Sequence, residues 1–287
     1  MNTSEAKSDQ KIYITCKDHT VSGEDFNLIF DPELDLLATS PKPDPDKLPS
    51  YYNSENYISH TDSKNSFTDK LYQQVKKIML KKKLNWIQSY FPEKGKLLDI
   101  GAGTGEFLLQ AKKQGWKVKG IEPDKKARIL AKQKGIKLVS NSGNFKAEKV
   151  DVITMWHVFE HVYDLKNQII ELEQLLKKNG LLIIAVPNYK SYDASYYKEF
   201  WAAFDVPRHL WHFSHRSFKQ LLAGTTFTEV DFKPLLFDSF YVSLLSEKNK
   251  TGKSNFLRSF YIGLKSNIKA KSTEEYSSMA YFFKKGE

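Results

Sequence analysis

The chain has 287 residues, a formal net charge of +10 and a single cysteine. Its length allows a large hydrophobic core, organised as one large domain or as one domain with a small addition. No apolar run approaches the roughly 20 residues that a membrane-spanning helix needs, the first ten residues are too polar for a secretion signal, and one cysteine cannot form an internal disulfide. These features predict a cytoplasmic globular protein.

The positive charge comes from lysines that gather between Lys64 and Lys149, including the run 81–83. Such a basic surface could bind nucleic acid through its phosphates. Arginine, the commoner reader of bases and phosphates, is scarce in this chain. We therefore favour a solvated helix surface, and RNA binding stays as an alternative.

The chain is expected to consist of four consecutive parts. Residues 1–65 form an N-terminal extension with a polar leader, two short strands (11–15 and 26–30) and a proline-rich linker. Apolar side chains recur at helical spacing from Leu71 to Ile87, which predicts a helical lead segment over 66–94. A core follows over 95–245 with a lid insert at about 189–224, and residues 246–287 supply a polar excursion and the final strand.

Strands and helices alternate regularly within the predicted core. The apolar runs predict strands at 97–100, 117–122, 136–140, 150–156 and 181–186. Alternation of this kind requires parallel strands joined by right-handed crossovers, so the fold class is α/β with a doubly wound sheet. A ligand is then expected at the carboxyl ends of the strands.

A glycine-rich turn follows the first of these strands. Asp99 precedes Gly101, Gly103 and Gly105, and the next strand ends on the acid Glu122. The glycines let the backbone approach a ligand closely, and the carboxylate can accept hydrogen bonds from both hydroxyls of a ribose. The sequence therefore predicts half of a nucleoside-binding site.

The order Asp-x-Gly-x-Gly-x-Gly resembles motif I of the class I S-adenosylmethionine (SAM)-dependent methyltransferases. The resemblance extends from about Gly95 to Phe237 and implies a Rossmann-like, mostly parallel seven-stranded sheet whose last strand is antiparallel. It also implies SAM as the cofactor. The implied cofactor-binding residues are Asp99, Gly101, Ala102, Gly103 and Gly105 for the methionine end, Glu122 and Pro123 for the ribose, Asn141 for the adenine, and Trp156 and His157 beside them.

The N-terminal part is similar to the lead segment of bacterial small-molecule methyltransferases that begin with a small zinc ribbon. Both have a proline-rich stretch, here from Pro41, followed by paired tyrosines, here Tyr51 and Tyr52. The ribbon needs four zinc ligands, whereas this chain has only Cys16. We expect a metal-free remnant that packs near the active site.

Polar side chains follow the strand at 150–156. His157 or His161 could act as a general base, because an imidazole titrates near neutral pH. His157, Glu160 and His161 also raise a metal alternative: ubiquinone-pathway O-methyltransferases carry Glu-x-x-Glu-His here, and His157 replaces the first glutamate. A third interpretation is that these residues only shape the loop and cap the next helix. We predict no metal.

A second polar cluster follows among aromatic residues, with Arg208 and His209 as tentative acceptor contacts. The alternative is a buried aromatic pair of helices with satisfied histidines.

The prediction is a SAM-dependent enzyme that methylates an oxygen or carbon of a small-molecule acceptor. An RNA methyltransferase, a non-catalytic SAM-binding protein and a metal hydrolase built on His157, Glu160 and His161 are the alternatives.

Overall fold

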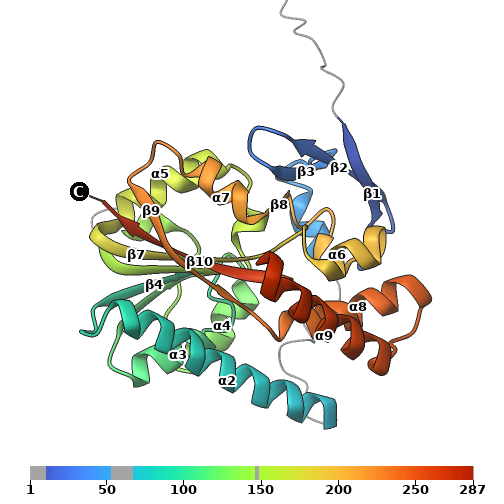
Figure 1. Cartoon of the computed structure of the whole chain (residues 1–287). Helices are drawn as coiled ribbons and strands as arrows, with labels where there is room; N and C mark the ends of the chain where they lie inside the picture. The colour runs from blue at the N-terminus through green and yellow to red at the C-terminus, as the bar shows by residue number, and fades with distance from the viewer. Residues whose placement is uncertain (1–10, 53–66, 146–148, 287) are drawn as a thin grey trace, which may run out of the picture. The chain divides into compact units, whose positions relative to one another are not determined.

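The computed structural model describes residues 11–52, 67–145 and 149–286. They divide into two compact units, each with its own sheet (Figure 1). Unit 1 comprises the described residues within 1–58, 187–221 and 234–278, and unit 2 comprises those within 59–186, 222–233 and 279–287. The units are thus built from alternating segments of the chain. The four consecutive parts expected from the sequence stay a prediction.

Unit 2 contains a six-stranded sheet. Its strands lie in the order β5 (Lys117–Ile121), β4 (Lys96–Ile100), β6 (Val150–Trp156), β7 (Leu176–Pro187), β10 (Ser278–Lys285) and β9 (Phe227–Pro234). The first four strands are parallel. The Gly286 amide donates to the carbonyl of Thr226 at one end of the β9–β10 pair, and the Leu235 amide donates to Ser278 at the other. This crossed order makes β10 antiparallel to β9 and confirms the predicted type of sheet.

The predicted strand at 136–140 does not form a full seventh strand. Val139 makes only an isolated parallel bridge to Ile121, at the outer edge of β5. The Val139 amide donates to Gly120, and the Glu122 amide donates to Val139. A segment at a sheet edge can pair with a strand on one side only. Here the two hydrogen bonds hold only Val139 in register with β5. The predicted number of seven strands is therefore not reached.

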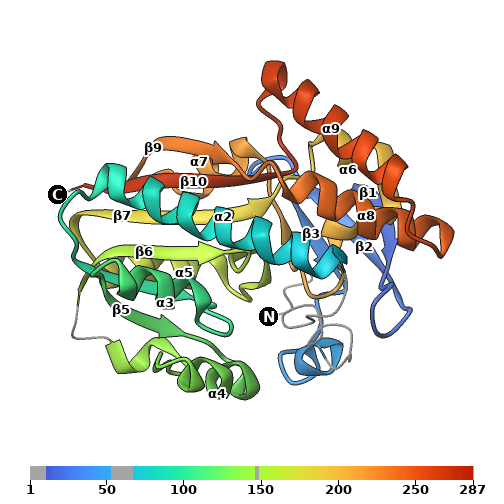
Figure 2. The same ribbon diagram turned by 90° about the horizontal axis from the view of Figure 1, so that it is seen from below.

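Four helices flank the parallel strands. Figures 1 and 2 show α2 (Phe67–Tyr90) and α3 (Glu106–Lys113) on one face of this sheet and α5 (Leu165–Leu175) on the other. The predicted lead helix is confirmed as α2, whose Leu84 and Ile87 are fully buried. The fourth helix, α4 (Lys125–Gln133), begins at Asp124, whose carboxylate accepts from two backbone amides of its first turn.

Unit 1 is built on an antiparallel sheet of β1 (Ile12–Lys17), β2 (Asp25–Asp31), β3 (Leu36–Ser40) and β8 (Trp211–His212). The two strands predicted at 11–15 and 26–30 correspond to β1 and β2. β3 and β8 are missed by the sequence analysis. β8 is only two residues long and pairs with a strand some 170 residues earlier, so no local pattern marks it.

The helices of unit 1 are α6 (Tyr192–Tyr197), α7 (His215–Leu221), α8 (Asp238–Thr251) and α9 (Phe256–Thr273). Single 3-10 turns lie at Leu48–Tyr52, Lys198–Phe200 and Ala202–Phe204. The segment 246–275, predicted as a polar excursion, instead contains the end of α8 and all of α9.

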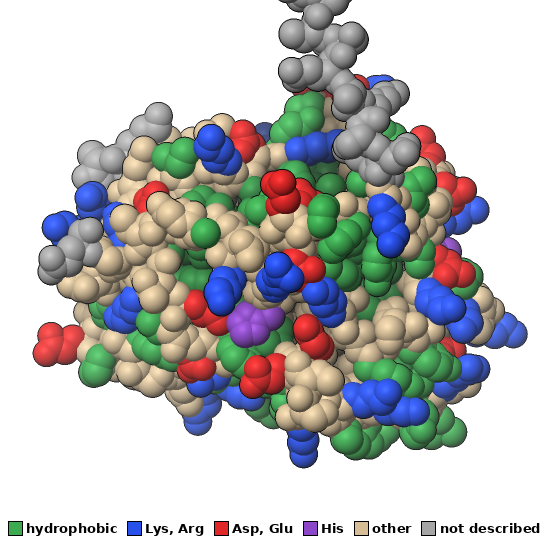
Figure 3. All heavy atoms as spheres, turned by 45° about the horizontal axis from the view of Figure 1, so that its top comes forward, with side chains coloured by type: hydrophobic (Ala, Val, Ile, Leu, Met, Phe, Trp, Pro, Cys, Tyr) green, Lys and Arg blue, Asp and Glu red, His purple; other side chains and the backbone are tan. Residues whose placement is uncertain are grey.

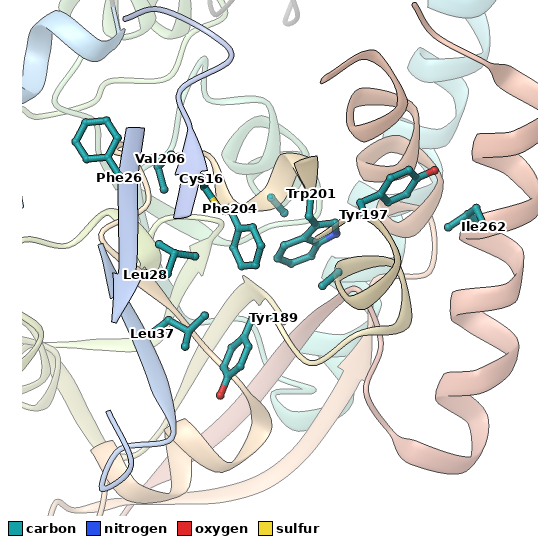
Figure 4. Packing of buried hydrophobic residues seen from close by; sticks show 12 residues of the cluster. Cys16, Phe26, Leu28, Leu37, Tyr189, Tyr197, Trp201, Phe204, Val206 and Ile262 are labelled. Carbon is teal, nitrogen blue, oxygen red and sulfur yellow. The ribbon is translucent and has the colours of Figure 1, made fainter. Parts of the chain in front are cut away.

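Buried apolar side chains from the antiparallel sheet and from the aromatic-rich residues 189–206 form the core of unit 1 (Figure 4). Trp201 and Phe204 lie edge to face, 5.0 Å apart, at its centre. Cys16 belongs to this core, and burial together with the Glu199 charge raises the pKa of its thiol to about 12. The thiol therefore stays protonated at neutral pH.

Positive and negative side chains are interspersed with hydrophobic ones on the face shown in Figure 3. This face carries no broad patch of one sign. Among the described residues, no helix has the length and apolar character needed to cross a bilayer.

A buried carboxylate ties three segments of unit 1 together. Asp193 of α6 is fully buried and accepts hydrogen bonds from Trp201 Nε1 (2.8 Å), Ser266 Oγ of α9 (2.7 Å) and Ser277 Oγ (2.7 Å). A charged acceptor strengthens each bond, and a donor that loses its acceptor in the interior keeps its desolvation cost.

We expect Asp193→Ala to lower the free energy of unfolding of unit 1 by about 3 kcal/mol or more, because three buried donors lose their acceptor. Asp193→Asn retains a carbonyl oxygen and should lose less. Ser195→Ala, on the exposed side of the same helix, should change stability by less than about 0.5 kcal/mol. Urea unfolding monitored by tryptophan fluorescence measures all three, and equal stability of the Ala variant and the wild type would contradict the role of Asp193.

Candidate active site

The carboxyl ends of three neighbouring strands in unit 2 bring the predicted residues together. Asp99 of β4 is in register with Gly120 of β5 on one side and with Thr154 of β6 on the other. The turn after β4, the acid after β5 and the polar loop after β6 therefore follow one edge of the sheet. This is the edge at which parallel α/β sheets bind ligands.

Two glycines of the turn after β4 have different roles. Gly101 has φ +72°, and a Cβ there would lie 2.2 Å from Val158 Cγ2, so only glycine fits beneath the β6 loop. Gly103 has φ +52°, and a Cβ there would meet no heavy atom within 4 Å. The first glycine is required by packing inside the unit, whereas the second leaves the backbone open to a ligand.

Glu122 holds this turn from the neighbouring strand. Its Oε2 accepts from the Gly103 amide (2.7 Å), and its Oε1 accepts from the Asp124 amide (2.9 Å). A carboxylate offers about four acceptor positions, so capacity remains for two hydroxyl donors. The carbonyl of the adjoining Pro123 accepts from Arg128 Nη1, which fixes the start of α4.

Asn141 comes two residues after the bridge that Val139 makes with the end of β5. It follows Val139, whose carbonyl accepts from the Glu122 amide at 2.8 Å. The Asn141 side chain is exposed, and its Oδ1 accepts from the Gly143 amide at 3.1 Å. Its position beside the adenine, which the resemblance implies, stays a prediction.

Asp99 is buried beneath the turn. Its Oδ1 accepts from Thr154 Oγ1 at 2.6 Å. Burial raises the pKa of Asp99 to about 7, and the Glu122 charge adds to this, while the Thr154 hydrogen bond and the Lys83 charge act in the opposite direction. Near neutral pH this carboxyl group is therefore partly protonated, and an added charge nearby would shift its protonation.

Lys83 is a site residue that the sequence analysis misses. It lies on α2, and its Nζ is 4.1 Å from the centroid of the Trp156 ring at the end of β6. Phe107 of α3 packs against the same ring edge to face, at 5.6 Å. In the sequence Lys83 is one lysine of a run assigned to the solvated helix face, and only the tertiary structure distinguishes it from Lys81 and Lys82.

The loop after β6 departs from the regular strand at His157. This residue has φ +56°, which is uncommon for a side chain other than glycine, and its amide donates to Ala185 of β7 at 2.9 Å. His157 Nδ1 lies 3.5 Å from Glu160 Oε1, with the imidazole 37% exposed and the carboxylate buried. His161 closes the 3-10 turn Phe159–His161, with its amide donating to Val158. The short loop after β6 thus carries both candidate bases, His157 and His161.

Arg208 and His209 lie in unit 1, and the described contacts of Arg208 are internal to it. The guanidinium is 1% exposed and reaches Asp18 Oδ1 (2.9 Å), Asp205 Oδ1 (2.7 Å) and the carbonyl of Tyr51 (3.0 Å). Burial opposes both charges, but the hydrogen bonds and charges of Asp205 and Asp18 raise the pKa of Arg208. The Arg208 hydrogen bond, with those from the Ser22 and Thr20 amides, lowers the pKa of Asp18 to about 2 against the effect of its burial. These contacts give Arg208 a structural role, and its contact with an acceptor stays a prediction.

His209 is 8% exposed, and its Nδ1 is 2.9 Å from the carbonyl of Ala203, so this nitrogen carries the proton. The neighbouring His212 lies 3.1 Å from Thr39 Oγ1, whose hydroxyl donates to the His209 carbonyl. Burial, aided by His209, lowers the pKa of His212 well below its usual value, so His212 is neutral. This arrangement agrees with the alternative of buried, satisfied histidines.

The features of the unit 2 edge fit a SAM molecule. The open backbone at Gly103 would admit the ligand, and the Glu122 carboxylate would accept from its hydroxyls. The buried Nε1 of Trp156 has no hydrogen-bond acceptor among the residues described. The edge therefore has an acceptor for ribose hydroxyls, an open backbone position at Gly103 and an indole donor without an acceptor in the described part of the chain.

Comparison with solved structures shows the same fold. The magnesium protoporphyrin IX methyltransferase of Synechocystis with bound S-adenosylhomocysteine is 14% identical and gives a TM-score of 0.57 over 85% of this chain and 100% of that one. The plantazolicin methyltransferase with the same ligand is 17% identical and gives 0.54 over 84% and 94%.

Curated relatives match more closely over a shorter stretch. A ubiquinone biosynthesis O-methyltransferase of Pelagibacter ubique is 39% identical over 107 residues, 34% of this chain and 45% of that protein. An uncharacterised protein of Methanocaldococcus jannaschii is 31% identical over 125 residues, 42% and 58%. The chain thus spans about half the length of the curated relatives it matches.

The family model described as a methyltransferase domain matches residues 73–231. This stretch is more than half of the chain and contains the glycine turn, Glu122 and the β6 loop, and the cofactor of this domain is SAM. The chain therefore belongs to the methyltransferase-domain family, as its motif I predicted.

Proposed function

We propose that this protein transfers a methyl group from SAM to an oxygen or carbon atom of a small-molecule acceptor. The observation that carries the proposal is the meeting of Gly103, Glu122 and Trp156 at one sheet edge, next to a loop with two histidines. When bound, the cofactor supplies an activated methyl group on a sulfonium. The chain's own residues must bind it, orient the acceptor and remove a proton where the acceptor is a hydroxyl.

Each part of the cofactor has a proposed partner. Glu122 accepts from the ribose hydroxyls, with the Pro123 backbone beside it, and Asn141 lies next to the adenine. The turn from Gly101 to Gly105, with Ala102, faces the methionine end. Trp156 and His157 complete the contacts from the β6 side.

Charge balance supports placing the methionine end near Asp99. This end carries an ammonium group and a carboxylate, and the structure has an acid with a raised pKa and a nearby cation, Lys83, in the same region. Ionised Asp99 would favour the ammonium group, and the Lys83 ammonium would favour the carboxylate. The ammonium group and the carboxylate of the methionine end each have an oppositely charged partner only when both Asp99 and Lys83 take part.

His157 or His161 is the proposed general base. Both are presented by the β6 loop, and Glu160 lies near enough to His157 to favour its protonated form after proton transfer. The name of the Pelagibacter relative, an O-methyltransferase of ubiquinone biosynthesis, supports an oxygen acceptor. A metal hydrolase is less well supported, because its motif needs a helix interior, whereas residues 157–161 form a strand end and a 3-10 turn.

Glu122→Ala is expected to weaken SAM binding by roughly tenfold to a hundredfold, because one or two hydrogen bonds to a carboxylate are lost. Isothermal titration calorimetry measures the change. Glu122→Gln keeps one acceptor oxygen and should fall between the two, and Glu93→Ala, at an exposed position, should bind as the wild type does. Unchanged affinity in the Ala variant would overturn the ribose assignment.

SAM binding near pH 6 should release protons from Asp99. The pKa of this group is about 7 without ligand, so it is largely protonated at pH 6, and the positive charges of the ligand favour the carboxylate. By the same linkage, Asp99 lowers the stability of the unliganded fold as pH rises from about 4 to about 7, the range in which only the unfolded state has ionised.

Calorimetry in two buffers of different ionisation enthalpy measures this release. Asp99→Asn keeps an acceptor for Thr154 Oγ1 but has no proton to lose, so the release should be smaller than in the wild type by the share that Asp99 supplies. The same proton count in both proteins would show that Asp99 is already ionised or lies away from the ligand's charge.

Turnover with labelled SAM and a cell-extract metabolite pool tests the proposed reaction. The label should move into the low-molecular-weight fraction, and replacing the base, by His157→Gln or His161→Gln, should lower kcat by about 10²- to 10⁴-fold with little change in SAM affinity. Label in RNA, with binding that weakens steeply with salt, would favour the RNA alternative. SAM binding without turnover in any fraction would favour the non-catalytic alternative.

A further inference from the structure

Helix α9 has a buried line of mostly small residues on one side and an exposed line of apolar side chains on the opposite side. One line faces the interior of unit 1 and is formed by small or apolar residues, namely Ser259, Ile262, Gly263, Ser266 and Ala270. The other line faces outward and is strongly exposed: Leu257 (86%), Phe260 (60%), Tyr261 (58%), Leu264 (41%) and Ile268 (56%). Their spacing of three, four, seven and eleven residues from Leu257 keeps them on one stripe of the helix.

The neighbouring helix α8 holds this outward stripe in place. Gly263 of α9 lies so close to Phe240 of α8 that a Cβ would come within 2.9 Å of the Phe240 backbone. The Phe240 and Phe260 rings stack at 5.2 Å, and Tyr241 of α8 adds a further side chain that is 40% exposed. The apolar stripe therefore belongs to a packed helical hairpin. Contiguous exposed apolar surface of this kind marks an interaction site.

The charges around the stripe are all positive on α9 itself. Residues 256–273 include Arg258, Lys265, Lys269 and Lys271 but no aspartate or glutamate. Lys265 and Lys269 lie 5.2 and 4.4 Å from the centroid of the Tyr192 ring, and the Arg258 guanidinium donates to the Tyr196 hydroxyl at 2.8 Å. Tyrosines of α6 thus position three of the four cations along one edge of the apolar stripe.

We propose that the outward stripe of α9 docks this protein on the surface of an anionic lipid bilayer. A helix that lies in the plane of the interface places aromatic and aliphatic side chains at the boundary between headgroups and acyl chains. Lysines and arginines along its edge reach the phosphates of anionic lipids, and tyrosines favour the same depth. Leu257, Phe260 and Ile268 supply the apolar contacts, and Lys265 and Lys269 supply the charge.

Charge complementarity distinguishes this partner from others. Arg258 is paired with Glu247 of α8 at 3.4 Å, but a second copy of the chain docked through the same stripe would still bring the three lysines of one α9 toward those of the other, with no acid on either α9 to compensate them. A nucleic acid would match the charge but would leave the aliphatic side chains of the stripe without apolar contacts. An anionic bilayer satisfies both the charge and the apolar area.

Flotation of the full-length protein with lipid vesicles, without SAM, tests the proposal separately from methyl transfer. The protein should bind vesicles of phosphatidylcholine with about 30% phosphatidylglycerol at least tenfold more strongly than pure phosphatidylcholine, and salt should weaken the binding. The double variant Leu257→Asp/Ile268→Asp should lose this binding at least tenfold. Ile129→Asp on α4, where the isoleucine is 50% exposed, is the matched control and should float as the wild type does.

Three outcomes would overturn the proposal. The first is no vesicle binding by the wild type, and the second is equal loss in the Ile129→Asp control. The third is self-association of the wild type in sedimentation that the double variant abolishes, because this would assign the stripe to a second copy. Lys269→Glu, at an exposed position, separates the two contributions, since it should weaken binding to anionic vesicles and leave any binding to phosphatidylcholine unchanged.

Discussion

The packing of Val158 against the backbone of Gly101 is the constraint on which the site of unit 2 depends. A methyl group on Gly101 would lie 2.2 Å from Val158 Cγ2, so the turn after β4 and the loop after β6 can meet only because one of them has no side chain there. This contact places the glycine turn beside the loop that carries both candidate histidines. The glycine turn of the candidate cofactor site and the loop that carries the proposed base are thus held together by van der Waals contact within one unit.

Much of unit 2 could be predicted from the sequence because its signals are local. The turn of Gly101, Gly103 and Gly105, the acid at Glu122 and the alternation of strands and helices each occupy a few consecutive residues. A seventh strand was predicted at 136–140, but its reduction to one bridge at Val139 could not be predicted, because it depends on pairing at the edge of the assembled sheet. Lys83 was missed for a related reason: three adjacent lysines look alike until α2 packs on the sheet and turns one of them over Trp156.

Unit 1 shows the limit of reasoning from residue types. An arginine among histidines and aromatic side chains suits a lid that grips an anion, but it equally suits a buried structural cation. The deciding partner is Asp18, which lies 190 residues before Arg208 in the sequence and 2.9 Å from it in the structure. Breaking a buried pair of this kind is costly because it leaves one charge uncompensated. The same reasoning applies to Asp193, whose donors come from three separate segments.

The charges of the candidate site suggest why Asp99 is buried at all. An acid that is kept out of water by the fold and held by a single hydroxyl is poorly stabilised as an anion, so its pKa rises. A positively charged ligand stabilises the Asp99 carboxylate, and this interaction adds to the free energy of binding. A neutral or anionic nucleoside gains no such interaction. Glu122 and the glycine turn recognise features that many nucleosides share, whereas Asp99 responds to charge. The combination therefore favours a cationic cofactor over other nucleosides at this edge of the sheet, which agrees with SAM and its sulfonium and ammonium groups.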